Sequence, residues 1–135
     1  MSDVVQGKIR NIRDHVRRLR EVDPGDLAGL ENDLMRQESV LLNLQRACQA
    51  SIDLALHVAN AKALGPVSDS RAAFQVLAQA GVIERDLAAR LEGMVGFRNL
   101  AVHQYHRLDL RIVRSVLDER LDDLLAWCDR AAAAT

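Results

Sequence analysis

Three side chains suited to chemistry on phosphate lie close together in this sequence: Arg98, His103 and Tyr105. Arginine is a permanent cation whose planar guanidinium fits a phosphate group. Histidine is the side chain that exchanges a proton most readily near neutral pH. The pair therefore suggests metal-free chemistry on a phosphodiester. The alternative is an ion-pairing arginine and a histidine that caps the carbonyls at a helix end, with no chemistry at all.

The spacing of Arg98 and His103 restricts how they can act together. Five residues correspond to a rotation of roughly 140° around a regular helix, so the two side chains diverge in mid-helix. They converge only if the helix ends near His103 and the backbone turns there. We therefore predict a helix end at His103, followed by a short polar loop over residues 104–106, which is a common place for functional residues.

Cleavage of RNA by attack of the 2′-oxygen needs a base, an acid and a group that stabilises charge on the phosphate. His103 can serve as base or acid, and Arg98 can stabilise the charge. The second proton-transfer group would come from a facing copy in a two-fold dimer, or from His106 or His57 of the same chain. Asn99 could donate a hydrogen bond to phosphate or cap the backbone around the site.

Two further features carry charge. Asp53 and His57 are four residues apart on a predicted helix and could face the motif, or form an ordinary solvated pair. Residues 8–20 hold six basic side chains and one acidic one, which could bind RNA phosphates or an acidic partner, or simply form a solvated helix face. His15, within this run, is expected at the surface.

The composition favours a single all-α domain over residues 1–135. The chain is 49% hydrophobic and 27% charged, with only 3% aromatic residues and two prolines, so an aliphatic core and helices are expected. The formal net charge of −1 lacks the basic surplus typical of nucleic-acid-binding proteins.

The sequence shows no pattern typical of a metal site, a disulfide, a signal peptide, a membrane span or a cofactor site. Cys48 and Cys128 fit no metal-ligand spacing, and we expect no disulfide between them, which suits a reducing cytoplasm. The first residues lack an apolar signal-peptide core, and no apolar run reaches the roughly 20 residues that span a bilayer. Without a glycine-rich phosphate loop, zinc spacing or carboxylate cluster, we predict no metal and no cofactor.

Hydrophobic periodicity and capping residues predict five helices in an antiparallel bundle. The second is unusually long, so it should pack on more than one neighbour, and part of it could serve a dimer. Four of the expected helices cover residues 2–21, 27–61, 84–103 and 109–131, the last of them capped by Asp109. The remaining one is a short helix that is capped by Ser68, Asp69 or Ser70 and ends at Gly81.

The residues around the motif resemble a known family. The block Met94-Val95-Gly96-Phe97-Arg98-Asn99, followed by His103 and Tyr105, is similar to the R-x4-H-x-Y signature of the HEPN domain of the HepT toxins. In outline the resemblance covers nearly the whole chain. It implies a HEPN-like fold, a single-domain antiparallel bundle of about five helices.

The resemblance also implies a function: a metal-independent endoribonuclease that is the toxin of a toxin–antitoxin pair, acting as a homodimer with a composite cleft. Arg98 and His103 match the catalytic pair. Tyr105 matches the tyrosine that the partner antitoxin, a minimal nucleotidyltransferase (MntA), modifies with AMP; the added bulk and negative charge would repel RNA phosphates. Some related HEPN proteins are binding modules, so the alternative is a non-catalytic module that binds a nucleotidyltransferase or RNA.

Overall fold

The computed structural model describes residues 2–67, 69–103 and 108–135, except for the side chain of His103. The all-α prediction is confirmed, with seven helices rather than five in these residues. They are α1 (Asp3–Val22), α2 (Leu27–Asn32), α3 (Leu34–Ala61), α4 (Ser70–Gln79), α5 (Arg85–His103), α6 (Leu110–Glu119) and α7 (Leu121–Ala134).

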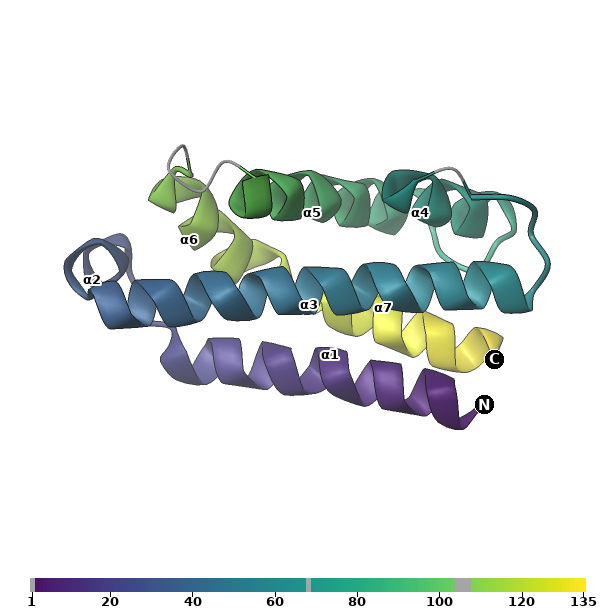
Figure 1. The fold of residues 1–135 in the computed structure, drawn as a ribbon, viewed down its shortest axis with the longest axis horizontal. Coiled ribbons are helices and arrows are strands. Elements are labelled where there is room, and N and C mark those ends of the chain that lie inside the picture. The colour runs from purple at the N-terminus through teal and green to yellow at the C-terminus, as the bar shows by residue number, and fades with distance from the viewer. Residues whose placement is uncertain (1, 68, 104–107) are drawn as a thin grey trace.

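The 28-residue helix α3 runs through the centre of the bundle. Helix α1 packs antiparallel along one side of it, and α4 and α5 pack on the opposite side (Figure 1). Helix α7 closes the bundle by contacting α1, α3 and α5. The two ends of the chain lie near each other, at the end of the molecule where α3 finishes (Figure 1).

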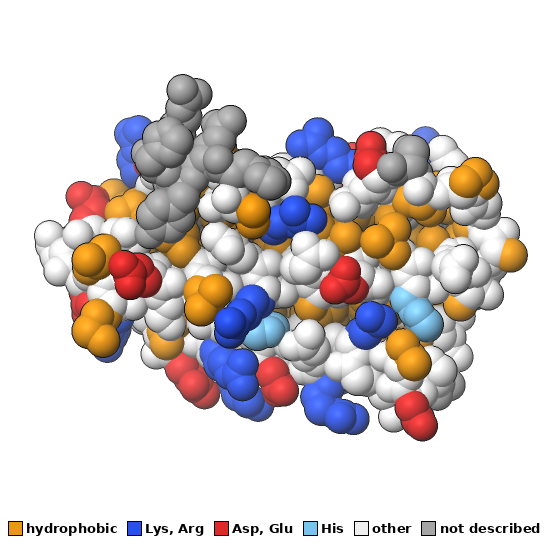
Figure 2. Space-filling model, in the orientation of Figure 1, with side chains coloured by type: hydrophobic (Ala, Val, Ile, Leu, Met, Phe, Trp, Pro, Cys, Tyr) orange, Lys and Arg blue, Asp and Glu red, His pale blue; other side chains and the backbone are white. Residues whose placement is uncertain are grey.

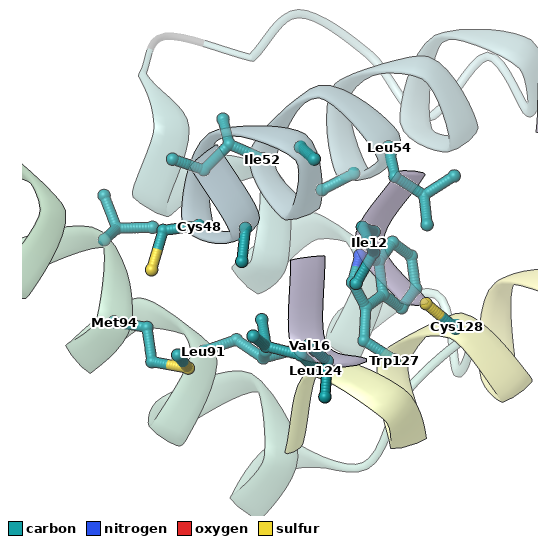
Figure 3. Close-up of a cluster of buried hydrophobic side chains, with 14 of the residues drawn as sticks. Ile12, Val16, Cys48, Ile52, Leu54, Leu91, Met94, Leu124, Trp127 and Cys128 are labelled. Carbon is teal, nitrogen blue, oxygen red and sulfur yellow. The ribbon is translucent and has the colours of Figure 1, made fainter. Parts of the chain in front are cut away.

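One hydrophobic core joins these helices. Figure 3 shows side chains from α1, α3, α5 and α7 meeting around Trp127, which is fully buried. Its indole Nε1 donates a hydrogen bond to the Ser51 carbonyl oxygen at 3.1 Å. The ring of Phe74 from α4 meets the Trp127 ring edge-on, with 6.0 Å between ring centroids. The indole therefore buries a large apolar surface while its single donor is satisfied.

The prediction of one helix over 27–61 is wrong, because the chain breaks between α2 and α3. Asp33 has an extended backbone (φ −121°, ψ 94°), and its carboxylate accepts a hydrogen bond from the Arg36 backbone N–H. Short acidic side chains compete for backbone donors in this way and favour helix starts over interiors. The break lets α2 bury Leu30 completely, whereas Leu34, four residues later, is 62% exposed.

The prediction of one helix over 109–131 is also wrong. Asp109 does cap α6, accepting a hydrogen bond from the Arg111 backbone N–H. The helix then ends at Glu119, with Arg120 as its C-cap, and α7 begins at Leu121 without a side-chain cap. Helix α6 contacts α2, whereas α7 contacts α1, α3 and α5. The two halves change direction to reach different neighbours, and the apolar spacing of the sequence does not show this change.

A bidentate ion pair fixes α6 to the turn after α1. The Arg114 guanidinium donates to the two carboxylate oxygens of Asp23 at 2.6 and 2.7 Å, and both side chains are mostly shielded from solvent. The hydrogen bond from Arg114 lowers the pKa of Asp23 below its ordinary value. Arg114 also pairs with Asp118 on its own helix. This joint holds α6 against the turn that follows α1.

We expect Asp23→Asn to lower the free energy of unfolding by about 1–3 kcal/mol at neutral pH, because the shielded Arg114 loses a charged acceptor. The folded-state pKa of Asp23 is lowered, so its contribution exists above the ordinary carboxyl pKa and disappears as the pH falls through the folded value. The unfolding free energies of wild type and variant, measured in urea, should therefore begin to converge only below about pH 4.

The matched control is Asp122→Asn, since Asp122 pairs with Arg20 at 2.8 Å but is 87% exposed. Its loss should cost under about 1 kcal/mol. Equal stability of the Asp23 variant and wild type at pH 7 would show that the joint does not hold the fold.

Candidate functional site

Arg98 lies on α5 where that helix packs against α3. Its Nε is buried and has no hydrogen-bond partner among the described residues. The Arg98 charge acts on the buried Cys48 thiol of α3 and lowers its pKa, but burial outweighs this effect and raises that pKa to about 12. Cys48 is therefore a neutral packing residue. No described carboxylate forms an ion pair with Arg98, so its charge is available to an anion.

The end of α5 is held against α3 by a glutamine that the sequence analysis did not single out. Gln45 Nε2 donates to the Ala101 carbonyl oxygen at 3.3 Å, and Ala101 is buried. The last four carbonyls of a helix lack intrahelical partners, so this bond satisfies one of them just before the helix ends. Polar residues are common in α3, so no local signal in the sequence distinguished Gln45.

Helix α5 is described as far as His103, the residue at which we predicted its end. The His103 side chain, Tyr105 and His106 lie outside the described residues, as does the predicted loop over residues 104–106. The convergence of Arg98 and His103 therefore stays a prediction. Asn99, the next supporting candidate, lines a hollow of about 300 Å³ between α5 and the start of α4, together with Asp69, Ser70, Arg71 and Val95.

Asp53 and His57 are not brought to Arg98 by any described hydrogen bond or ion pair. Asp53 accepts a hydrogen bond from Gln49 Nε2 at 2.9 Å at the surface. His57 lines a separate hollow of about 440 Å³ with residues at the end of α3 and the following turn, among them Asn60 and Pro66. Within one protomer the two residues are thus surface groups of α3, apart from the hollow that Asn99 lines.

Half of the basic side chains in the run on α1 form ion pairs with acidic residues of the same chain. Arg13 and Arg20 pair with acidic residues of α7, and Arg17 pairs with Asp14 on its own helix. This arrangement favours a solvated, internally paired face over a phosphate-binding one. The expectation that His15 is at the surface is wrong: it is buried, with Nδ1 3.3 Å from Oδ1 of Asn43.

The described residues contain neither a cluster of metal ligands nor a membrane-spanning helix. Nowhere in them do three or more His, Cys, Asp or Glu side chains gather closely enough to hold a metal ion. No helix among them is both long and apolar enough to cross a bilayer.

Comparison with protein families identifies the family to which the chain belongs. Residues 12–131 match the model of the family described as ribonuclease HepT-like. The chain belongs to the HepT-like ribonuclease family. It is 40% identical to the mRNA nuclease HepT of Shewanella oneidensis over 129 residues, which are 96% of each chain.

Solved structures of toxin–antitoxin proteins share the fold of this HepT-like chain. One is the tri-AMPylated Shewanella oneidensis HEPN toxin in complex with MNT antitoxin, with a TM-score of 0.92 and 40% identity over 98% of this chain and 99% of that one. Another is a toxin–antitoxin structure with AMP-PNP, with a TM-score of 0.91 and 38% identity, again over 98% and 99% of the two chains. The sequence-based assignment to the HepT family is confirmed.

Proposed function

We propose that this chain is the toxin of a toxin–antitoxin pair and cleaves RNA without a metal ion, using Arg98 and His103. The observation that carries the proposal is Arg98 itself. It is a partly buried cation that no described carboxylate neutralises, and it stands five residues before the end of α5 at His103 in a chain of the HepT-like ribonuclease family. Its relative in Shewanella oneidensis is named an mRNA nuclease.

The reaction is an attack of the ribose 2′-oxygen on the adjacent phosphorus. A base removes the 2′-hydroxyl proton as the new O–P bond forms, and an acid protonates the departing 5′-oxygen as the old P–O bond breaks. His103 fills one of these proton-transfer roles. Arg98 stabilises the negative charge that builds on the phosphate oxygens, an effect strengthened by its shielding from water.

The second proton-transfer group comes from a second copy of the chain in a homodimer whose two motifs face one another. The exposed surface of α3 supports this assembly. Met35, Leu42 and Leu56 are separated by multiples of seven residues, which places them along one side of the helix, and they are 84%, 45% and 37% exposed. Figure 2 shows hydrophobic side chains spaced along this face between charged ones. Val102, near the end of α5, is also exposed.

We expect Arg98→Ala and His103→Ala to abolish growth arrest and to lower the RNA cleavage rate by at least about 100-fold, because each removes a charge or proton-transfer group from the transition state. Growth after induction and cleavage of total RNA by the purified proteins measure this. Cleavage should continue in excess EDTA.

The matched control for Arg98 is Arg85→Ala at the other end of α5, which should stay active. His57→Ala and His106→Ala test whether the second proton-transfer group lies in the same chain; full activity of both supports the dimer. If the Arg98 and His103 variants cut RNA like wild type, the catalytic assignment is wrong. If folded wild type cuts nothing yet still binds a nucleotidyltransferase, the chain is a binding module.

Leu42→Glu should convert the dimer to a monomer and remove the ribonuclease activity, because a charge would be buried at the centre of the interface. Sedimentation and the cleavage assay report the two effects. Val4→Glu is the control, since Val4 is similarly exposed, at 52%, but lies on α1. A monomeric Leu42 variant with full activity would contradict the composite site.

We further propose that a minimal nucleotidyltransferase antitoxin silences this toxin by attaching AMP to Tyr105. The related Shewanella toxin in complex with MNT antitoxin is tri-AMPylated. The modification adds negative charge two residues beyond His103 and so repels RNA phosphates.

Co-expression with a nucleotidyltransferase encoded beside this chain should increase its mass by one or more adenylyl groups and remove its ribonuclease activity. Intact-protein mass spectrometry measures the change. Tyr105→Phe should stay unmodified and toxic in the presence of the antitoxin, because the hydroxyl that accepts AMP is gone. Full modification of the Tyr105→Phe protein would place the acceptor on another residue.

A further inference from the structure

Gly96 lies on α5 under the side chain of Arg71, which reaches across from α4. A Cβ atom built on Gly96 would stand 2.9 Å from Nη2 of Arg71, closer than real Cβ contacts come. Gly93, one turn earlier on the same helix, has nothing within 4 Å of its Cβ position. Glycine destabilises a helix relative to alanine. At position 96, however, the absence of a side chain leaves room for the guanidinium of Arg71 on the surface of α5.

Arg71 differs from most arginines of α1, α6 and α7, which pair with carboxylates. No described residue forms an ion pair or hydrogen bond with Arg71. It lines the hollow of about 300 Å³ that also holds Ser70 and Asn99. A planar cation, a hydroxyl and an amide together offer the donors that a phosphate group accepts.

The hollow also contains one acidic residue, Asp69. Its carboxylate oxygen Oδ1 accepts the Ala72 backbone N–H at 2.8 Å and caps α4. That oxygen is therefore engaged at the helix start, whereas the guanidinium end of Arg71 lies over Gly96 on α5.

The hollow adjoins the proposed catalytic residues along α5. Asn99 follows Arg98 directly and lies one helical turn beyond Gly96. Figure 2 shows basic side chains over α5 on the same face of the molecule as the exposed hydrophobic side chains of α3. An RNA strand whose scissile phosphate meets Arg98 would therefore have another phosphate within reach of this hollow.

We propose that Arg71, with Ser70 and Asn99, binds an RNA phosphate next to the scissile one, and that Gly96 is required because a side chain there would displace Arg71. The subsite rests on the proposed ribonuclease function and extends it to substrate binding. Arg71 is thus a substrate-binding residue outside the R-x4-H-x-Y motif, and it touches the RNA chain without taking part in bond breaking.

The test measures binding of a fluorescent single-stranded RNA to the full-length protein carrying His103→Ala, over a range of salt concentrations. Adding Arg71→Ala should weaken binding about tenfold and reduce the slope of log affinity against log salt by about 0.7, the value for one phosphate contact on single-stranded RNA. Adding Arg71→Lys should restore most of that slope, because the charge is kept. In the active protein Arg71→Ala should raise KM and leave kcat nearly unchanged.

The glycines supply a matched pair of variants. Gly96→Ala should keep or raise the melting temperature, because only the end of a flexible side chain must move, yet it should weaken RNA binding as Arg71→Ala does. Gly93→Ala should raise the melting temperature in the same way and leave RNA binding unchanged.

Unchanged RNA affinity and salt slope in both Arg71→Ala and Gly96→Ala would overturn the subsite while the ribonuclease function stands. Weaker binding with an unchanged salt slope would overturn it too, since it would indicate a structural role for Arg71. If wild type cleaves no RNA, the proposed function fails and the subsite fails with it.

Discussion

The structure depends most on the apolar character of α3 around most of its circumference. Leu44, Leu54 and Val58 are fully buried on one side of the helix, and Leu41, Ile52 and Ala59, which lie roughly 100° further round it, are buried as well. Helices α1, α4, α5 and α7 accordingly pack around α3 from different directions. One strip of α3 stays uncovered, and it carries Leu42 and Leu56. The proposed dimer face is therefore what the packing of the other helices leaves free.

The same helix determines the setting of Arg98. Helix α5 packs so closely on α3 that the Nε of Arg98 is excluded from solvent beside the thiol of Cys48. A buried donor without a partner costs free energy, and the Nε of Arg98 has no hydrogen-bond acceptor among the described residues. A phosphate oxygen could supply the missing acceptor. Packing against α3 thus prepares the arginine for an anion before any substrate arrives.

Helix type and helix starts could be predicted from the sequence because they depend on local signals. Asp109 was expected as a cap and is one, and Asp69, one of three candidate caps, is the residue that caps α4. The breaks at Asp33 and Arg120 could not be found by periodicity, because the apolar spacing continues across both. At each break the chain changes direction and packs on a different helix. The position of the break therefore depends on tertiary packing and not on local sequence.

The site was predicted only as far as the motif extends. Arg98 and Asn99 are recognisable because they stand in a continuous block with His103. Arg71 lies 27 positions before Arg98 and meets α5 only through the antiparallel packing of α4 on α5. In the sequence near Arg98, only Gly96 reflects that contact. The need for a glycine there becomes clear only when the packing of α4 on α5 is known. Gln45 escaped prediction in the same way, since its partner is a backbone carbonyl of another helix.

The chain contains a single tryptophan, and the structure places it at the centre of the core. Trp127 is fully shielded from water, with its indole hydrogen-bonded to the backbone of α3. Its fluorescence should shift to longer wavelength only when the helices around it separate. Substitutions on the exposed strip of α3 or at the end of α5 leave its surroundings intact. The molecule therefore carries a built-in optical probe of its folded state, separate from the residues proposed to act on RNA.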